Sequence, residues 1–470
     1  MPFLPVFLWT DILIYLLLAV VVSAVLYIRR RPHLRAPWKS VLLRKRGVIS
    51  LMILLCYVAV GLLDSVHFRT AIPTQQTDET RHYSTEVNTL LDLAILPLRD
   101  NVEKTYSAPF ATDLFVREMG ASQDGTLHYD FPKLLYAGAH LQNDQDKWSD
   151  ITNSVIINSS WVLLGWCFIS ILMMFYLARH HKTTCFKTIR QVLLGKAHYP
   201  YRTVLVTLLM LLLVGSNLAE LSSQYHILGT DKVGQDVLYQ TLKSVRTGLV
   251  IGTLTTLVML PFALFMGIAA GYFKGWIDDV IQYIYTTLNS IPGVLLIAAA
   301  VLMLQVYMNN HPESFVTIAE RADMRLLFLC IILGLTSWTG LCRILRGETL
   351  KLREAEYVLA ARALGVSSLT ILHRHILPNL MHIVMITIVL DFSGLVLAEA
   401  VLSYVGVGVD PSMISWGNMI NSARMEMARE PVVWWSLSAA FISMFTLVLA
   451  ANLFADVVRD AFDPRMQATQ

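Results

Sequence analysis

The sequence predicts an all-α protein that crosses a membrane several times, and three observations lead to this prediction. Hydrophobic residues make up 55% of the 470 residues, and only 15% are charged. The mean hydropathy is +0.55, and a soluble chain carries about 25% charged residues. Apolar runs of about 18 residues or more, long enough to span a bilayer, recur along the chain. These features exclude a soluble, disordered or collagen-like protein.

Nine apolar stretches are the candidate spans, in chain order. They are residues 7–28, 48–63, 155–177, 203–219, 248–271, 279–307, 325–341, 380–404 and 433–455. Asp11 interrupts the first stretch and the basic cluster follows it, so we expect a retained helix and not a cleaved signal peptide. The five cysteines show no metal-site or disulfide spacing, and we interpret them as small buried hydrophobic residues.

Basic residues are distributed unevenly among the connecting segments. Residues 29–46 contain eight lysines and arginines and no acid, and residues 179–202 contain six and no acid. Residues 64–153 contain fourteen acids and seven basic residues. Because short basic loops stay in the cytoplasm, we place both basic segments inside and residues 64–153 outside. The N-terminus then lies outside and the C-terminus lies in the cytoplasm.

These assignments divide the chain into four parts. The parts are residues 1–63, two extra spans with a basic cytoplasmic loop; residues 64–153, the acidic external segment; residues 154–202, a further span with a basic loop; and residues 203–465, a core of six closely spaced spans. Amphipathic helical spacing within 85–99 and 108–120 predicts that the external segment folds as a small domain and is not a flexible tail.

The cytoplasmic loop 343–379 has the pattern of a helix, a turn and a second helix. A small apolar face precedes the turn and contains Tyr357, Ala360, Ala361 and Leu364. Gly365 ends the first helix, Ser367 or Ser368 caps the second, and Pro378 ends the second. Such a hairpin fits the groove of another protein or rests on the bilayer surface, and periodicity alone does not decide between the two.

The run EYVLAARALGVSSLTILHRHILPN within this loop resembles the coupling-loop signature of ATP-binding-cassette (ABC) importer permeases of the dipeptide/oligopeptide family. The matching positions are Ala360, Ala361, Gly365, Leu377 and Pro378. Leu359 stands where the motif has glutamate and His375 where it has isoleucine, and Glu354 and Glu356 are nearby substitutes for the missing acid. The resemblance implies that the loop, including Tyr357, couples the chain to an ATPase.

A second stretch, residues 226–252, resembles the external segment of the same family. The matching residues are His226, Gly229, Thr230, Asp231, Gly234, Asp236, Val237, Arg246 and Gly252, whereas Ile227 replaces proline and Gln235 replaces arginine. We expect turns at Gly229 and Gly234, followed by an amphipathic stretch. Two interpretations stay open: a structural turn in which Thr230 or Asp231 caps a helix, or direct contact with a partner or substrate.

A third stretch, residues 398–420, also resembles the family and places Glu399 in the eighth span, with Asp391 two turns earlier. Acids at membrane depth face a bundle interior or a water-filled path. Both acids are therefore candidates for the neighbourhood of the translocation path, or for a proton relay. A buried, hydrogen-bonded packing role is the other interpretation.

The resemblance as a whole implies a type I importer permease core that forms half of a pore for peptides or similar small solutes in the bacterial cytoplasmic membrane. It implies a second homologous permease, two ABC ATPases carrying ATP and Mg²⁺, and an extracytoplasmic solute-binding protein as partners. The sequence has no G-x-x-x-x-G-K-[ST] phosphate loop, so we expect no enzymatic activity, catalytic residue, cofactor or metal on this chain. We expect contact with membrane lipid and none with nucleic acid. Nickel complexes and oligosaccharides are alternative substrates, and an ion-coupled secondary transporter is the alternative class.

Overall fold

The computed structural model describes residues 3–71, 83–121, 127–141, 143–180, 190–192, 199–314 and 317–462. Within these residues, nine helices are long and apolar enough to cross a membrane. They are α1 (Trp9–Arg30), α3 (Lys45–Asp64), α6 (Lys147–His180), α8 (Tyr201–Leu221), α9 (Val237–Phe273), α11 (Gly293–Asn310), α12 (Ile318–Arg353), α15 (Leu377–Tyr404) and α17 (Trp435–Phe462). The all-α membrane fold and the nine predicted spans are confirmed, with a difference at the sixth.

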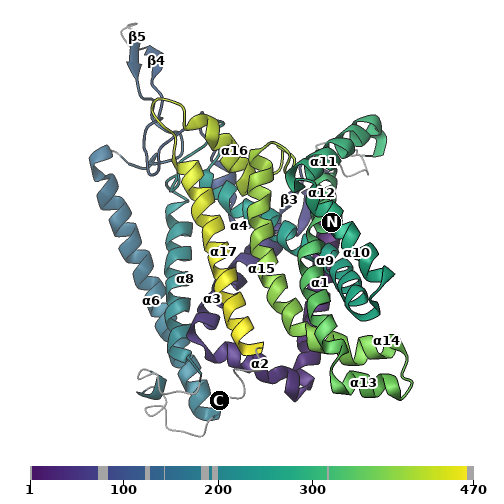
Figure 1. Cartoon of the computed structure of the whole chain (residues 1–470). Coiled ribbons are helices and arrows are strands. Elements are labelled where there is room, and N and C mark those ends of the chain that lie inside the picture. Colours follow the sequence, from purple (N-terminus) through teal and green to yellow (C-terminus); the bar gives the residue numbers. More distant parts are fainter. Residues whose placement is uncertain are drawn as a thin grey trace, which may run out of the picture. The chain divides into compact units, whose positions relative to one another are not determined.

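Shorter elements connect these helices (Figure 1). The short helices are α2 (Pro32–Leu43), α4 (Leu90–Ala94), α5 (Leu96–Asp100), α10 (Trp276–Ser290), α13 (Glu356–Ala363), α14 (Ser368–Ile371) and α16 (Trp416–Glu426). The strands are β1 (Phe3–Val6), β2 (His67–Thr70), β3 (Asn88–Thr89), β4 (Glu118–Ala121) and β5 (Leu127–Asp130). The chain forms two compact units.

The first unit comprises Met1–Val6, Lys39–Arg246 and Ile414–Ala450, so it combines the external segment with part of the predicted core. Polar side chains join its membrane helices α6 and α8. Asn158 Nδ2 donates to Asn217 Oδ1 at 3.2 Å, and Asn217 Nδ2 donates to Ser159 Oγ at 3.1 Å. Such amide and hydroxyl groups commonly hold membrane helices together, because lipid offers them no alternative partner.

The external segment forms a small antiparallel sheet together with the N-terminal strand β1, and it contains two short helices. In the sheet, β1 pairs with β2 and β2 pairs with β3, with Phe3 opposite Thr70. Helix α4 and all but the last residue of α5 lie within the amphipathic stretch noted at 85–99. Thr89 and Asp92 form a reciprocal capping box at the start of α4.

The second amphipathic stretch, 108–120, is not helical, although its spacing is that of a helix. Its backbone groups bind other segments instead of each other: Phe110 N–H donates to the carbonyl of His226 at 3.0 Å, and Phe115 N–H donates to that of Tyr106 at 3.0 Å. The stretch ends in β4, which pairs with β5 as a projecting hairpin (Figure 1). The apolar spacing serves a small core around Leu114 and not a helix face.

The second unit comprises Phe7–Trp38, Thr247–Met413 and Ala451–Gln470. Its long helices approach closely at glycines, where a side chain would not fit. A Cβ on Gly334 of α12 would lie 2.7 Å from the side chain of Val258, and a Cβ on Gly271 of α9 would lie 2.5 Å from that of Thr349. Small residues permit such close approach between membrane helices.

Two prolines change the predicted helix boundaries in this unit. The predicted continuous span 279–307 is divided into α10 and α11, because Pro292 has no N–H and starts a new helix at Gly293. The prediction that Pro378 ends a helix was wrong. Pro378 lies in the first turn of α15, and α14, a π-helical turn at Leu372–Ile376 and α15 continue as one helix over Ser368–Tyr404.

The cysteines only partly follow the interpretation as buried residues. Cys330 and Cys342 are buried, whereas Cys56 and Cys167 are exposed on this chain. Both exposed cysteines lie in helices with the length and apolarity of membrane spans, where lipid accepts an apolar side chain as readily as a protein core does. Cys185 lies outside the described residues.

Candidate functional site

The loop predicted to couple the chain to an ATPase consists of a short helix and the start of a long one, which lie together at one end of the second unit (Figure 1). After α12 ends at Arg353, α13 forms the short helix, and α14 is the first turn of the long helix that continues into α15. One side of the pair is anchored in the core of the second unit: Val358 and Ile371 are fully buried, and Ala361 is 8% exposed.

The other side of the loop is exposed and carries large apolar side chains on both sides of its turn, with Arg362 exposed among them. Leu364 is 84% exposed and Leu369 is 77% exposed, one on each side of the turn. The exposed surface also includes Tyr357, Leu359 and Ala360. The two alanines of the motif therefore point in different directions, Ala361 to the chain's own core and Ala360 outward.

Gly365 makes the turn that the sequence predicted. Its φ is +76°, a value that residues with a Cβ rarely adopt. The Gly365 N–H donates to the carbonyl of Arg362 at 3.0 Å, and the Val366 N–H donates to that of Ala361 at 3.1 Å. These bonds close the end of α13 as glycine C-caps commonly do.

Side chains tie the two arms of the loop together. Asn379 Nδ2 donates to Tyr357 Oη at 3.0 Å and to the carbonyl of His375 at 2.7 Å. Ser367 is the N-cap residue of α14, as one of the two predicted candidates, but its hydroxyl binds that of Thr370 at 2.8 Å and caps no N–H group. The other two predicted loop residues lie beside Asn379: Leu377 is half-buried and Pro378 is exposed.

Two ion pairs at the base of the loop have no local signal in the sequence. Arg346 donates from Nε and Nη2 to both oxygens of Asp278, at 2.6 and 2.8 Å. Lys274 Nζ donates to Glu354 at 3.2 Å. The hydrogen bond from Lys274 and its charge keep the pKa of Glu354 below its ordinary value. Of the two acids named as substitutes for the motif glutamate, Glu354 is paired within the chain, and Glu356 is exposed.

The external motif is a tight turn bound to the external segment. Thr230 is fully buried, and its hydroxyl accepts from the Ser107 N–H at 2.7 Å and donates to the carbonyl of Thr105 at 2.8 Å. Its own carbonyl accepts from Trp435 Nε1 at 2.9 Å. The hydroxyl and the carbonyl of Thr230 are thus both hydrogen-bonded within the chain.

Both glycines of the motif are required by this packing. Gly229 has φ +71° and Gly234 has φ +76°, so the predicted turns are present at both positions. A Cβ on Gly229 would overlap the carbonyl oxygen of Ser107, and one on Gly234 would overlap the backbone of Glu103. The Glu103 N–H also donates to the carbonyl of Gly234 at 2.9 Å.

A buried ionic cluster lies next to these turns. His226 Nδ1 lies 2.7 Å from Asp236 Oδ2, and Nε2 lies 3.6 Å from Glu103 Oε1. Burial alone would lower the pKa of His226, but the hydrogen bond to Asp236 and the Glu103 carboxylate raise it to about 9. Burial would raise the pKa of Glu103, and His226 together with backbone N–H groups, including that of Leu135, brings it below the ordinary value.

The carboxylates of the motif differ in what they cap. Asp236 accepts from the backbone N–H groups of Leu238 and Tyr239 at 2.7 and 3.2 Å, so it caps α9. Asp231 instead accepts from the N–H groups within the turn, and the prediction that Thr230 or Asp231 caps the helix was wrong. The amphipathic stretch after the motif is the first part of α9 itself, and Arg246 is buried in it.

A second ionic cluster joins α3, α4 and α9 and was not predicted. Lys243 Nζ lies 3.2 Å from Asp64 and 3.0 Å from Asp92, and Tyr239 Oη donates to Asp92 at 3.0 Å. Burial alone would raise the pKa of Asp92, but the Lys243 charge and hydrogen bonds bring it below the ordinary value. Since the partners are far apart along the chain, no local sequence pattern predicts the cluster.

The two intramembrane acids differ in burial. Glu399 is 1% exposed and accepts from Ser403 Oγ at 2.9 Å, as a packing acid does. Asp391 is half-buried. The residues described also contain no group of three or more His, Cys, Asp or Glu side chains that could hold a metal ion.

Comparisons with known proteins agree with this arrangement. Residues 263–468 match the family described as binding-protein-dependent transport system inner membrane component. A glutathione transport system permease of Pectobacterium atrosepticum is 32% identical over 248 residues, which cover 52% of this chain and 75% of the relative. An oligopeptide transport system permease of Mycobacterium bovis is 34% identical over 239 residues (51% and 76%), and a dipeptide transport system permease of Bacillus subtilis is 30% identical over 244 residues (52% and 69%).

The relatives are matched over most of their length, whereas about half of this chain is matched, as an N-terminal extension requires. The projecting loop, the six core spans and these alignments agree: the chain belongs to the inner membrane permeases of binding-protein-dependent ABC importers, in the branch that includes the dipeptide and oligopeptide permeases.

Proposed function

We propose that this chain forms half of the translocation pore of an ATP-driven importer for peptides or similar small solutes. The observation that carries the proposal is the loop around Gly365, where an anchored hairpin exposes Leu364 and Leu369 at its tip. Large apolar side chains at a projecting tip mark a surface for a protein partner. The names of the relatives, which refer to glutathione, oligopeptides and dipeptides, support peptides as the substrate class.

The partner at this tip is an ABC ATPase subunit, and ATP and Mg²⁺ bind there and not on this chain. Leu359 in place of the motif glutamate makes this one exposed position apolar, so the ATPase groove is apolar where it meets Leu359. A second homologous permease supplies the other half of the pore and docks a second ATPase. Closure of the two ATPases moves both loops and shifts the pore between inward- and outward-facing states.

The permease lies in the bacterial inner membrane with its N-terminus outside and its C-terminus in the cytoplasm. The charge distribution among the loops supports this orientation. Within the first unit, β1 pairs with β2 of the external segment, so residues 3–6 lie on the same side as residues 67–70. Within the second unit, the backbone N–H of Thr10 at the start of α1 donates to Asp323 near the start of α12 at 3.2 Å, so both helices begin on one side.

The external segment seats the solute-binding protein. The β4–β5 hairpin supports this assignment, because the cross-strand pair Met119 and Tyr129 is 60% and 64% exposed. Replacing residues 117–131 by a short Gly-Ser linker removes the hairpin. It retains Glu103 and Ser107 and their contacts with the motif at residues 226–236. Lower affinity for the binding protein, with an intact permease–ATPase complex, is expected. Unchanged affinity would assign the segment to stabilising this subunit or to contacting the partner permease.

The two motif alanines provide the test of the coupling loop. Ala360→Glu places a charge on the exposed face, so we expect unchanged thermal stability and loss of ATPase co-purification. Ala361→Leu overpacks the anchored face, so we expect a loss of about 1–3 kcal/mol of stability. Co-purification of the ATPase subunits with each variant, and thermal unfolding, distinguish the two effects. Full ATPase binding by Ala360→Glu would show that this loop is not the docking element.

A further inference from the structure

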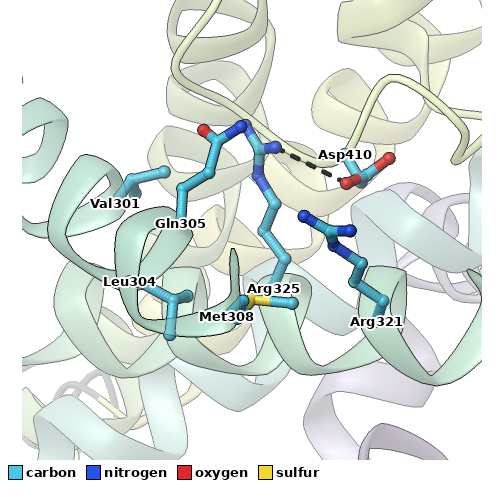
Figure 2. A pocket seen from close by; sticks show the side chains of 7 residues that line it. All are labelled: Val301, Leu304, Gln305, Met308, Arg321, Arg325 and Asp410. Carbon is cyan, nitrogen blue, oxygen red and sulfur yellow. Dashed lines mark hydrogen bonds and ion pairs between the residues drawn. The ribbon is translucent and has the colours of Figure 1, made fainter. Parts of the chain in front are cut away.

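A small cavity lies between the ends of α11 and α12 that the topology places outside. Its volume is about 20 Å³, enough for one water molecule. Figure 2 shows the polar side chains that line it: Gln305 from α11, Arg321 and Arg325 from successive turns of α12, and Asp410 from the segment after α15. Leu304 and Met308 form its apolar floor.

The lining carries more positive than negative charge. Two guanidinium groups face the single carboxylate of Asp410, and like charges four residues apart on a helix repel each other. Arg321 donates to Asn309 Oδ1, a neutral acceptor. One positive charge of the pair is therefore not balanced by the acid that lines the cavity.

Arg325 is also incompletely bonded, although it is buried. The residue is 9% exposed, and Nη1 lies 3.5 Å from Asp410 Oδ2, at the long limit for a hydrogen bond (Figure 2). Among the described residues its Nε has no hydrogen-bond partner. A buried guanidinium that lacks acceptors is costly, and an incompletely bonded group of this kind calls for a further ligand.

We propose that Arg321 and Arg325 bind a carboxylate of the transported solute at this cavity, an inference that rests on the proposed importer function. Guanidinium groups match a carboxylate by paired N–H donors. The Gln305 amide supplies a further donor on the same rim. Arg321 and Gln305 are exposed side chains on this chain, so the two lie on the open rim of the cavity, next to the buried Arg325.

Asp410 makes this site suited to release as well as to binding. When no solute is present, Asp410 is the acid next to Arg325. An arriving carboxylate competes with Asp410 for the guanidinium, so its net binding is weak. A transport site must bind strongly enough to admit the solute and weakly enough to let it leave.

The test uses a thiol reporter at Gln305 in the full-length chain within its complex, with the five native cysteines replaced. We expect Gln305→Cys to react at least about tenfold faster with an anionic than with a cationic methanethiosulfonate, because of the two guanidiniums. Acetate, a small carboxylate probe, is expected to slow the reaction, and its neutral amide, acetamide, is not. Arg321→Gln and Arg325→Gln should each remove the acetate protection. Lys232→Gln, which removes an exposed positive charge elsewhere, should retain it.

Peptides then identify the source of the carboxylate. A tripeptide with a free C-terminus is expected to protect the reporter, and its C-terminal amide is not. Equal protection by acetate and acetamide, or acetate protection that persists in the exposed-site variant Arg321→Gln and in Arg325→Gln, would overturn the proposal. Protection by acetate but by neither peptide would overturn the assignment to the solute. Failure of the importer function itself appears separately, as absence of peptide uptake by the complete wild-type complex.

Discussion

His226 links the family motif to the external segment, residues 64–153. Its imidazole lies between Asp236, which caps α9, and Glu103 of the external segment. The segment also covers Gly229 and Gly234 so closely that a Cβ at either position would overlap its backbone. These residues of the motif are therefore used inside the chain, and the interpretation of the motif as a structural turn fits them better than direct contact with a solute.

The buried position of His226 gives stability a specific pH dependence. The pKa of His226 is raised to about 9 in the folded protein, above the ordinary value near 6.5. The stabilisation is therefore complete below about pH 6.5 and is lost as the pH rises through 9, an effect on the order of 3 kcal/mol. We expect thermal unfolding to show this decline in the wild type and not in His226→Gln. His311→Gln, at an exposed histidine, serves as the control, and a decline that persists in His226→Gln would contradict the assignment.

The effect of a proline on a helix could not be predicted from the sequence alone. Pro261 lies inside the continuous helix α9, Pro292 separates α10 from α11, and Pro378 lies in the first turn of α15. The same residue type thus has three outcomes, because packing around each helix decides whether the lost hydrogen bond is tolerated. Long apolar runs and glycine turns are local features, and the sequence predicted both.

Contacts between distant elements were not predictable. Arg346 and Asp278 are 68 residues apart, and Lys243 and Asp92 are 151 residues apart, so neither pair leaves a local pattern. The positions of Ala360 and Ala361 illustrate the same limit at shorter range. Both match the motif, and only the packing of α13 on the core shows that one is buried and the other exposed.

The pairing of α6 with α8 is testable as a property of two elements. Asn217→Leu removes the hydrogen bonds to Asn158 and Ser159, and we expect a loss of about 1 kcal/mol in helix association, as is typical of interhelical hydrogen bonds in membranes. Val214→Ala, at a position 60% exposed on the same helix, is the matched control. Unfolding in mixed detergent micelles measures both variants. Equal stability of Asn217→Leu and the wild type would show that these bonds do not hold the pair together.

At the scale of the whole molecule, the proposed orientation rests on the charge of the loops, and two pairings of the N-terminal residues are consistent with it. Lys- and Arg-rich loops determine the sides of the membrane. The strand β1 and the start of α1 are each bound to elements assigned to the outside, namely β2 and the first turns of α12. The extra spans thus form part of both compact units and are not appended to the end of a separate permease core.

Labelling of single cysteines tests this orientation. Cysteines at the positions of Lys39, Arg190 and Ala360 should react only with membrane-permeant reagents, and cysteines at Asp100 and Ser412 should react with impermeant reagents from outside. All five side chains are described, and each is exposed on this chain. Intact cells compared with permeabilised cells give the measurement. Labelling of position 39 from outside would reverse the first two spans.

The pairing of β1 with β2 also constrains the order of events during synthesis. Residues 3–6 find their partners only when residues 67–70 emerge, roughly sixty residues later. At about 5–20 residues per second, the first strand waits on the order of 3–12 s with its backbone groups unpaired. Such an edge is prone to pairing with the wrong strand. Pro5 has no N–H to donate, so β1 pairs less readily with a wrong strand. The first strand therefore stays available until β2 is synthesised.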